Sequence, residues 1–325
     1  MEFRTSLQPV NQSPSIQLGD RFVTLGSCFA NSMDQKLREN KFQSLNNPLG
    51  ILYDPSSIVR VLTYAIEGSR PDDDSYYSIN DMVVNLETHS DMRGRTLDEV
   101  SEAIDIRLSK LSSELKKANW LILTLGTSWV YTQISSGLQV ANCHKIPQKE
   151  FEKSLLSHIV TEPQYDQLLK KLKDFNPDLT IIITVSPVRH VKDTLPLNSL
   201  SKSHLLILAH YLNNNHENVF YYPSYELILD DLRDYRFYKT DLLHPTDQAV
   251  DYVWEHFIQS YFSKEALGFL NEWESIRKAL LHKAFNPSSP KHQQFVKTTI
   301  EKLKKLPSKI DVTEEIDTLT MQLVG

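Results

Sequence analysis

The chain has 325 residues, of which 40% are hydrophobic and 23% are charged, and its formal net charge at pH 7 is -6. Such a composition is typical of a folded protein with a full hydrophobic core, long enough for one large α/β domain and an appended segment. The acidic balance, with no basic run on a predicted helix, argues against a nucleic-acid partner.

The N-terminal residues 1–6 lack the basic and apolar stretches of a signal peptide, and no run of roughly 18 apolar residues occurs. We therefore expect a cytoplasmic protein without a membrane partner. The two cysteines, Cys28 and Cys143, lie far apart in the sequence, which argues against a disulfide framework and against a cysteine-based zinc site.

The first predicted unit is a strand at 21–25 that ends at Gly26 and is followed by a helix with Phe29, Met33 and Leu37 at helical spacing. A second helix is expected to begin at Pro55. Residues 67–94, rich in Asp, Ser and Gly, predict a loop with one strand at 82–86.

Farther along the chain, predicted helices and strands alternate. Helical stretches are predicted at 96–115 and 202–212, and a third helical region is interrupted at Pro163. Apolar strands are predicted at 120–125, 179–185 and 219–222. Strands that alternate with helices pair in parallel through right-handed crossovers. The predicted fold class is therefore α/β, with a doubly wound, mainly parallel sheet flanked by helices.

Beyond Phe262 the apolar strands cease, and three amphipathic helical stretches follow at 263–283, 291–305 and 312–323. We therefore predict an α/β domain over 1–262 and a helical extension over 263–325. The extension either packs on the main domain or binds a partner, and an apolar helix stripe more often reflects packing.

The residues that follow the predicted strands are the first candidates for chemistry, because open α/β sheets bind ligands at the carboxyl ends of their strands. These segments are 26–28, 126–129 and 186–190, and a further polar segment, 241–246, precedes the last helix of the domain.

Ser27 lies between a strand and a helix, where its hydroxyl is accessible and backbone amides and the helix dipole favour an oxyanion. This setting indicates a nucleophile, although a serine here also serves as a helix cap. Asp241 lies three residues before His244 on a predicted loop. That spacing lets the carboxylate hold one ring nitrogen of the histidine while the other nitrogen faces the serine.

This combination resembles the SGNH hydrolase superfamily, whose first block holds a serine after the first strand and whose last block is Asp-x-x-His. Residues 26–30, reading Gly-Ser-Cys-Phe-Ala, resemble the motif that names the GSCFA domain family. Similar blocks extend the resemblance over roughly residues 20–260 and lie at 47–50, 89–90, 126–131, 142–145 and 186–190.

The resemblance implies a serine ester hydrolase or acyltransferase. In it, Ser27 is the nucleophile, His244 the base and Asp241 the carboxylate that orients the base. The resemblance also implies that the amide of Gly50 joins the oxyanion hole.

One departure concerns the third SGNH block, which usually holds an Asn that completes the oxyanion hole. The matching segment has Thr127 and Ser128 and no Asn. Thr127, Ser128 and the Asn142 side chain are the replacements that we consider, since the loss of one such donor costs about 3 to 4 kcal/mol in related chemistry.

Other polar residues allow two interpretations each. Arg189 either binds an anionic or sugar substrate or forms a structural ion pair, and His89 lies in a loop that is a candidate to fold over the pocket. His144 fits a structural histidine better than a ligand. Trp129 and Tyr131 form either a sugar-stacking wall or, more commonly, part of the core.

The leading hypothesis is an enzyme that cleaves or transfers an O-acyl group, in particular acetyl on a carbohydrate-like substrate, through an acyl-serine and without a metal or organic cofactor. A second hypothesis makes Cys28 the nucleophile, although its side chain is expected to point away from that of Ser27, into the core. A third is a non-catalytic binding or interaction module on the same fold.

Overall fold

The computed structural model describes residues 4–282 and 285–323, and the chain divides into two compact units. An α/β unit is formed by Met1–Gln8, Arg21–Lys36 and Ser44–His256. A helical unit is formed by Pro9–Asp20, Leu37–Gln43 and Phe257–Gly325.

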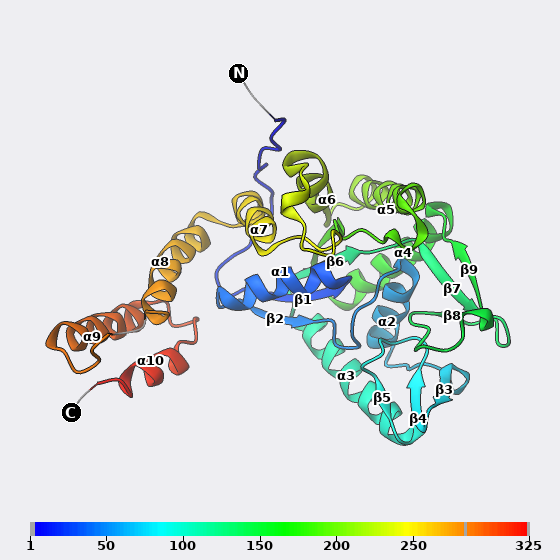
Figure 1. The fold of residues 1–325 in the computed structure, drawn as a ribbon, viewed down its shortest axis with the longest axis horizontal. Coiled ribbons are helices and arrows are strands. Elements are labelled where there is room, and N and C mark those ends of the chain that lie inside the picture. The colour runs from blue at the N-terminus through cyan, green and yellow to red at the C-terminus, as the bar shows by residue number, and fades with distance from the viewer. Residues whose placement is uncertain (1–3, 283–284, 324–325) are drawn as a thin grey trace. The chain divides into compact units, whose positions relative to one another are not determined.

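The α/β unit is built on a five-stranded sheet (Figure 1). Its strands are β1 (Arg21–Gly26), β2 (Gln43–Asn46), β6 (Trp120–Leu125), β10 (Thr180–Val185) and β11 (Val219–Tyr222). Their order is β11-β10-β6-β1-β2, and β1, β6, β10 and β11 pair in parallel. The chain reverses its winding direction between β1 and β6, the doubly wound arrangement. The predicted α/β fold with a mainly parallel sheet is therefore confirmed.

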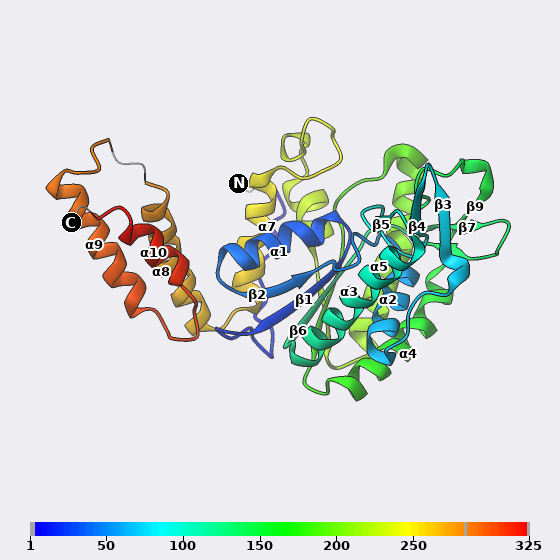
Figure 2. The same ribbon diagram turned by 90° about the horizontal axis from the view of Figure 1, so that it is seen from below.

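Helices cover both faces of this sheet (Figure 2). One face carries α2 (Pro55–Glu67), α3 (Leu97–Lys117), α4 (His158–Phe175) and α5 (Leu195–Asn215). Their apolar stripes join Val23, Leu123 and Ile183 in one buried cluster. On the opposite face lie α1 (Cys28–Glu39) and α7 (Asp247–Tyr261). Because β6 and β10 are buried along their whole length, they are nearly continuous apolar runs.

The helices begin at capping residues. Asp54 and Thr96 accept backbone N–H groups at the starts of α2 and α3, and Ser157 does the same for α4. The sequence predicted an interruption at Pro163, but α4 runs through this residue. Buried side chains in the turns around it, such as Tyr165, keep the helix continuous although one backbone hydrogen bond is missing.

Two small antiparallel sheets lie beside the main sheet at the end where β1 and β6 finish (Figure 1). The first comprises β3 (Tyr76–Ile79), β4 (Met82–Asn85) and β5 (Arg93–Gly94), and the second β7 (Trp129–Gln133), β8 (Gln139–Val140) and β9 (Phe151–Leu155). Only β4 was anticipated, as the strand at 82–86. A small core of Leu86, Val140, Ile146 and Phe151 joins the two sheets.

The helical unit contains α8 (Lys264–Leu280), α9 (Pro290–Lys305) and α10 (Thr313–Thr320). These helices confirm the predicted C-terminal helical region; the last residue of the predicted 263–283 stretch lies outside the described residues. The unit also takes in earlier segments, because the ring of Phe42 packs edge-on against Phe262 at 5.3 Å. In addition, Trp273 Nε1 donates to the Glu39 carbonyl at 2.7 Å.

The helical unit therefore differs from the predicted 263–325 segment. The reason is that contacts between residues distant in sequence leave no local pattern. Within the described ranges, none of the helices combines the length and the apolar character needed to cross a membrane.

Candidate active site

Ser27 lies in a tight turn between β1 and α1. Gly26 has a φ of +131°, and a Cβ there would lie 2.1 Å from the carbonyl oxygen of Thr124, so the turn requires glycine. The Ser27 N–H donates to that carbonyl at 2.9 Å, while Ser27 Oγ accepts the N–H of Phe29 at 3.4 Å. The hydroxyl is therefore held at the start of α1, as a helix cap is.

A cavity of about 270 Å³ opens at this turn. Its floor comes from the carboxyl ends of β1, β6 and β10 and includes Ser27, Cys28, Gly126, Thr127 and Ser186. This is the point where the strand order reverses, and open α/β sheets bind ligands there. One wall comes from the second small sheet and its neighbouring loop and contains Trp129, Val130, Tyr131, Val140 and Ala141.

Asp241 and His244 form a hydrogen-bonded pair. Asp241 Oδ2 is 2.7 Å from His244 Nδ1, and Asp241 Oδ1 accepts the backbone N–H groups of His244 at 3.0 Å and Leu243 at 2.8 Å. The two backbone hydrogen bonds, together with that from the imidazole, lower the pKa of Asp241 to about 2. The carboxylate is thus ionised at neutral pH and fixes the imidazole through Nδ1, which leaves Nε2 available for proton transfer.

Arg189 connects the cavity to the loop that carries this pair. Its side chain lines the cavity, and its guanidinium lies 5.0 Å from the ring of Tyr235 and 4.5 Å from that of Tyr238. Nη2 donates to the carbonyl of Leu242, and the backbone N–H donates to that of Leu243 at 3.4 Å. Arg189 therefore helps to position the Asp241–His244 loop through cation–π stacking and a hydrogen bond to a carbonyl. None of its described contacts is an ion pair.

The structure describes no hydrogen bond between Ser27 Oγ and the imidazole of His244. The pair nevertheless lies within electrostatic reach of the serine turn. Burial raises the pKa of the neighbouring Cys28 thiol, the charge of Asp241 adds to this rise, and Lys202 opposes it. About 44% of each side chain of the pair is exposed, and neither Asp241 nor His244 is among the described residues that line the cavity.

Cys28 lies in the cavity, which corrects our expectation that its side chain would point into the core. The thiol is partly exposed and lines the same cavity as Ser27. The expectation assumed the roughly 100° step between successive helical residues. Ser27, however, precedes α1, and only Cys28 is helical. Because burial raises its thiol pKa, Cys28 is mainly protonated at neutral pH and is a weak nucleophile there.

Gly50 and Asn142 are not among the described residues that line the cavity. The Gly50 N–H donates to the Asn47 carbonyl at 2.8 Å within a turn. A Cβ at Gly50 would lie 2.2 Å from the Cβ of His89, so this glycine allows close packing against the histidine. The Asn142 side-chain oxygen accepts the His144 N–H at 2.8 Å and closes a local turn.

Thr127 and Ser128 have different environments. Thr127 lines the cavity, and its Oγ1 lies 3.1 Å from the Ser201 hydroxyl. Ser128 is buried away from the cavity: its N–H donates to Ser201 Oγ at 2.8 Å and its hydroxyl to the Ser201 carbonyl at 2.5 Å. Of the two, only Thr127 has a side chain placed to meet a ligand.

The two remaining histidines of the sequence prediction lie outside the cavity lining. His89 Nδ1 is 3.1 Å from an Asp91 carboxylate oxygen. His144 Nε2 is 3.1 Å from the Thr88 carbonyl, and burial lowers the pKa of its imidazole. His144 thus has the contacts of a structural histidine.

Sequence reasoning missed Lys202 at this site, and it included His190 in the segment 186–190 without giving it a role. His190 lines the cavity, and its ring nitrogens are buried with no hydrogen-bond partner among the described residues. Lys202 on α5 is 1% exposed, and its ammonium donates to the carbonyls of Gly126 at 2.6 Å and Ser186 at 2.7 Å. The sequence could have indicated that Lys202 is buried, because this lysine lies on the same apolar stripe of its helix as Leu205.

Burial shifts the titration of both groups. It lowers the pKa of Lys202 to about 7. Burial together with the charge of Lys202 lowers the pKa of His190 to about 4, against a smaller opposing effect of Asp193. The imidazole is therefore neutral at neutral pH. In the part of the chain that the structure describes, no cluster of three or more His, Cys, Asp or Glu side chains is arranged to hold a metal ion.

Comparison with protein families gives two matches. Residues 21–257 match the model of the GSCFA family, and residues 273–325 match that of the GSCFA domain protein, C-terminal domain. The first match runs from β1 to α7 and includes every residue of the site. No curated protein matches the chain.

Proposed function

The chain belongs to the GSCFA family, and from this premise we propose that it is a serine ester hydrolase or acyltransferase of the SGNH type. The observations that carry the proposal are the position of Ser27 on a strand-to-helix turn in a cavity and the ionised Asp241, which is bonded to His244 and whose charge acts on Cys28 beside the serine. A serine hydroxyl becomes a nucleophile only beside a base, and a carboxylate that fixes the imidazole makes that base effective.

The proposed reaction has two steps. Ser27 Oγ attacks the acyl carbonyl carbon while its proton passes to Nε2 of His244, and the leaving alcohol takes that proton when the ester bond breaks. Water or a second alcohol then attacks the acyl-serine, again losing its proton to His244, which returns it to Ser27. The base is expected to reach Ser27 Oγ only when substrate binds, because the described structure shows no hydrogen bond between them and catalytic hydrogen bonds often tighten only in the substrate complex.

The size and lining of the cavity support a small acyl group. About 270 Å³ lies at the lower end of ligand pockets, and the wall at Trp129, Val130 and Val140 is apolar. A short acyl group such as acetyl, carried on a carbohydrate-like alcohol, suits this space. The cytoplasmic location expected from the sequence stays a prediction.

A non-catalytic ligand-binding module is the second candidate, and one observation favours it. The backbone N–H groups of Ser27, Gly126 and Thr127 all donate to carbonyl oxygens, so they are not free to bind an oxyanion. A pocket without such donors binds a ligand but stabilises no tetrahedral intermediate.

Hydrolysis of p-nitrophenyl acetate distinguishes the two candidates without knowledge of the natural substrate. Ser27→Ala is expected to abolish the reaction. Cys28→Ala, which changes the adjacent cavity residue, is the matched control and is expected to retain it. Equal rates for the wild type and Ser27→Ala would support the binding module, and loss of activity in Cys28→Ala alone would make the thiol the nucleophile.

A further inference from the structure

An acyl transfer at Ser27 needs donors for the negative charge that develops on the carbonyl oxygen of the substrate. One candidate backbone donor is the N–H of Cys28, at the first position of α1, which donates to no backbone carbonyl among the described residues and only to its own thiol. The amide after a nucleophilic serine commonly serves this purpose. A second donor is required, and neither Gly50 nor Asn142 lines the cavity.

Two cavity residues, Arg189 and His190, have buried nitrogens without a partner among the described residues; Arg189 still bonds through Nη1 and Nη2, whereas both ring nitrogens of His190 are unpaired. The backbone of His190 is anchored, since its N–H donates to Asn198 Oδ1 at 3.0 Å, whereas both ring nitrogens are buried without a partner in the described structure. Asp193 Oδ2 lies 3.8 Å from Nδ1, too far for a hydrogen bond, and this carboxylate contacts Lys153 instead. Leaving buried polar atoms unpaired costs free energy, so such a group calls for an explanation.

In its protonated form, Lys202 makes this part of the cavity favourable for negative charge. Its ammonium is fully buried beneath Gly126 and Ser186, two cavity residues, and uses two of its three N–H groups on their carbonyls. Its positive charge acts on both Cys28 and His190. The same charge disfavours a proton on the imidazole, so His190 meets a ligand as a neutral ring with one N–H donor.

We propose that His190 is a catalytic residue: its imidazole N–H binds the carbonyl oxygen of the acyl group at Ser27, together with the N–H of Cys28. Lys202 is a positioning residue: its positive charge keeps the His190 ring neutral and favours negative charge in this part of the cavity. This inference rests on the proposed function and assigns the donor that the family resemblance leaves open. No proton is transferred to or from His190 in this role.

Kinetics of p-nitrophenyl acetate hydrolysis test the role of the ring. His190→Phe keeps the size of the side chain and removes the donor, and we expect it to lower kcat about 100-fold with little change in KM, as for other oxyanion-hole donors. His190→Gln keeps an N–H donor and is expected to recover part of kcat. A purely structural role would predict equal losses in both variants, and equal losses would overturn the proposal.

The adduct of a fluorophosphonate with the wild-type protein gives an independent readout that needs no variant to fold. In its crystal structure, we expect the phosphoryl oxygen within hydrogen-bond distance of a His190 ring nitrogen and of the Cys28 N–H. An adduct on Ser27 whose oxygen contacts neither His190 nitrogen would overturn this inference and leave the proposed function intact. Absence of both hydrolysis and labelling in the wild type would overturn both.

Discussion

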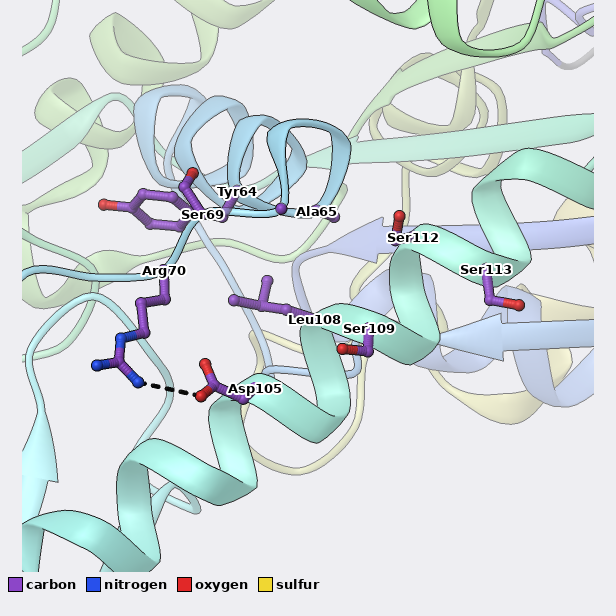
Figure 3. A pocket seen from close by; sticks show the side chains of 10 residues that line it. Tyr64, Ala65, Ser69, Arg70, Asp105, Leu108, Ser109, Ser112 and Ser113 are labelled. Atoms are coloured by element: carbon purple, nitrogen blue, oxygen red, sulfur yellow. Dashed lines mark hydrogen bonds and ion pairs between the residues drawn. The ribbon is translucent and has the colours of Figure 1, made fainter.

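Two of the hollows in the described part of the α/β unit differ in size and in chemistry. The larger, of about 720 Å³, lies between α2 and α3 and is lined by Tyr64, Arg70, Asp105 and a row of serines on α3 (Figure 3). The smaller, of about 270 Å³, lies at the carboxyl ends of the central strands and contains Ser27.

The charged residues and the tyrosine of the larger hollow have hydrogen-bond partners. Arg70 pairs with Asp105 at 3.1 Å, with about half of each side chain exposed, and the Tyr64 hydroxyl donates to Glu87 at 2.9 Å. The smaller hollow instead buries the imidazole of His190 without a partner. Buried, unsatisfied polar groups at the strand ends therefore indicate a ligand-binding site more specifically than the volume of a hollow does.

Among substitutions that test this difference between the two hollows, His244→Ala is expected to cause the largest loss of esterase activity. Without its base, Ser27 is a poor nucleophile, so kcat for p-nitrophenyl acetate should fall on the order of 10⁵-fold. His89→Ala is the matched control, because His89 also lies in a loop with its Nδ1 beside an aspartate, Asp91, and it should remain near the wild-type rate. Similar losses in the two variants would contradict the assignment of the base.

Asp241→Asn should have a smaller effect, on the order of 10⁴-fold in kcat, because the carboxylate orients the base but carries no proton itself. Asp234→Asn is a suitable control: Asp234 also accepts a backbone N–H in the same region, that of Arg236 at 2.8 Å. If both substitutions reduce kcat equally, the effect comes from the loop conformation and not from the Asp241–His244 pair.

The buried His190 also predicts a pH dependence of stability. Its folded pKa of about 4 lies below the ordinary value of 6.5, so the unfolded chain binds more protons between these values. Its contribution to the free energy of unfolding is therefore fully present above pH 6.5 and is lost as the pH falls toward 4, by up to about 1.4 kcal/mol per pH unit. Urea denaturation of the wild type should show this slope, whereas His190→Gln should show less of it; parallel curves would contradict the shifted pKa.

The smallest effect is expected in the larger hollow. Arg70→Ala breaks a half-exposed ion pair, which contributes little to stability. Ser109→Ala removes a hydroxyl from the α3 side of the hollow (Figure 3). Both variants should hydrolyse p-nitrophenyl acetate within about twofold of the wild type. A tenfold loss of kcat in either variant would contradict this difference between the hollows, because it would show that the larger hollow contributes to ester hydrolysis.

The central strands and the reactive turns were predictable from local sequence. The runs at 120–125 and 179–185 are apolar throughout because both of their faces are buried. The turn at Ser27 could be predicted because Gly26 directly follows the apolar strand. The Asp241–His244 pair could be predicted because the two residues are three positions apart. Each of these features depends on neighbours along the chain.

The remaining features depend on contacts between distant segments. Gly50 packs closely against the Cβ of His89, a residue far along the chain, and no local pattern shows this contact. The central strand β7 also pairs with β9, which follows it only after β8 and two loops. Lys202 was overlooked because a lysine in an apolar stripe resembles a surface residue until the carbonyls of Gly126 and Ser186 are placed above it.

The most direct test of the central claim is a fluorophosphonate reaction with the wild-type protein, followed by peptide mass spectrometry to locate the label. The probe phosphonylates a serine only when a neighbouring base activates it. We predict a single covalent label on Ser27 that is absent from Ser27→Ala and strongly reduced in His244→Ala. An unlabelled Ser27, or a label on Cys28 in its place, would contradict the account.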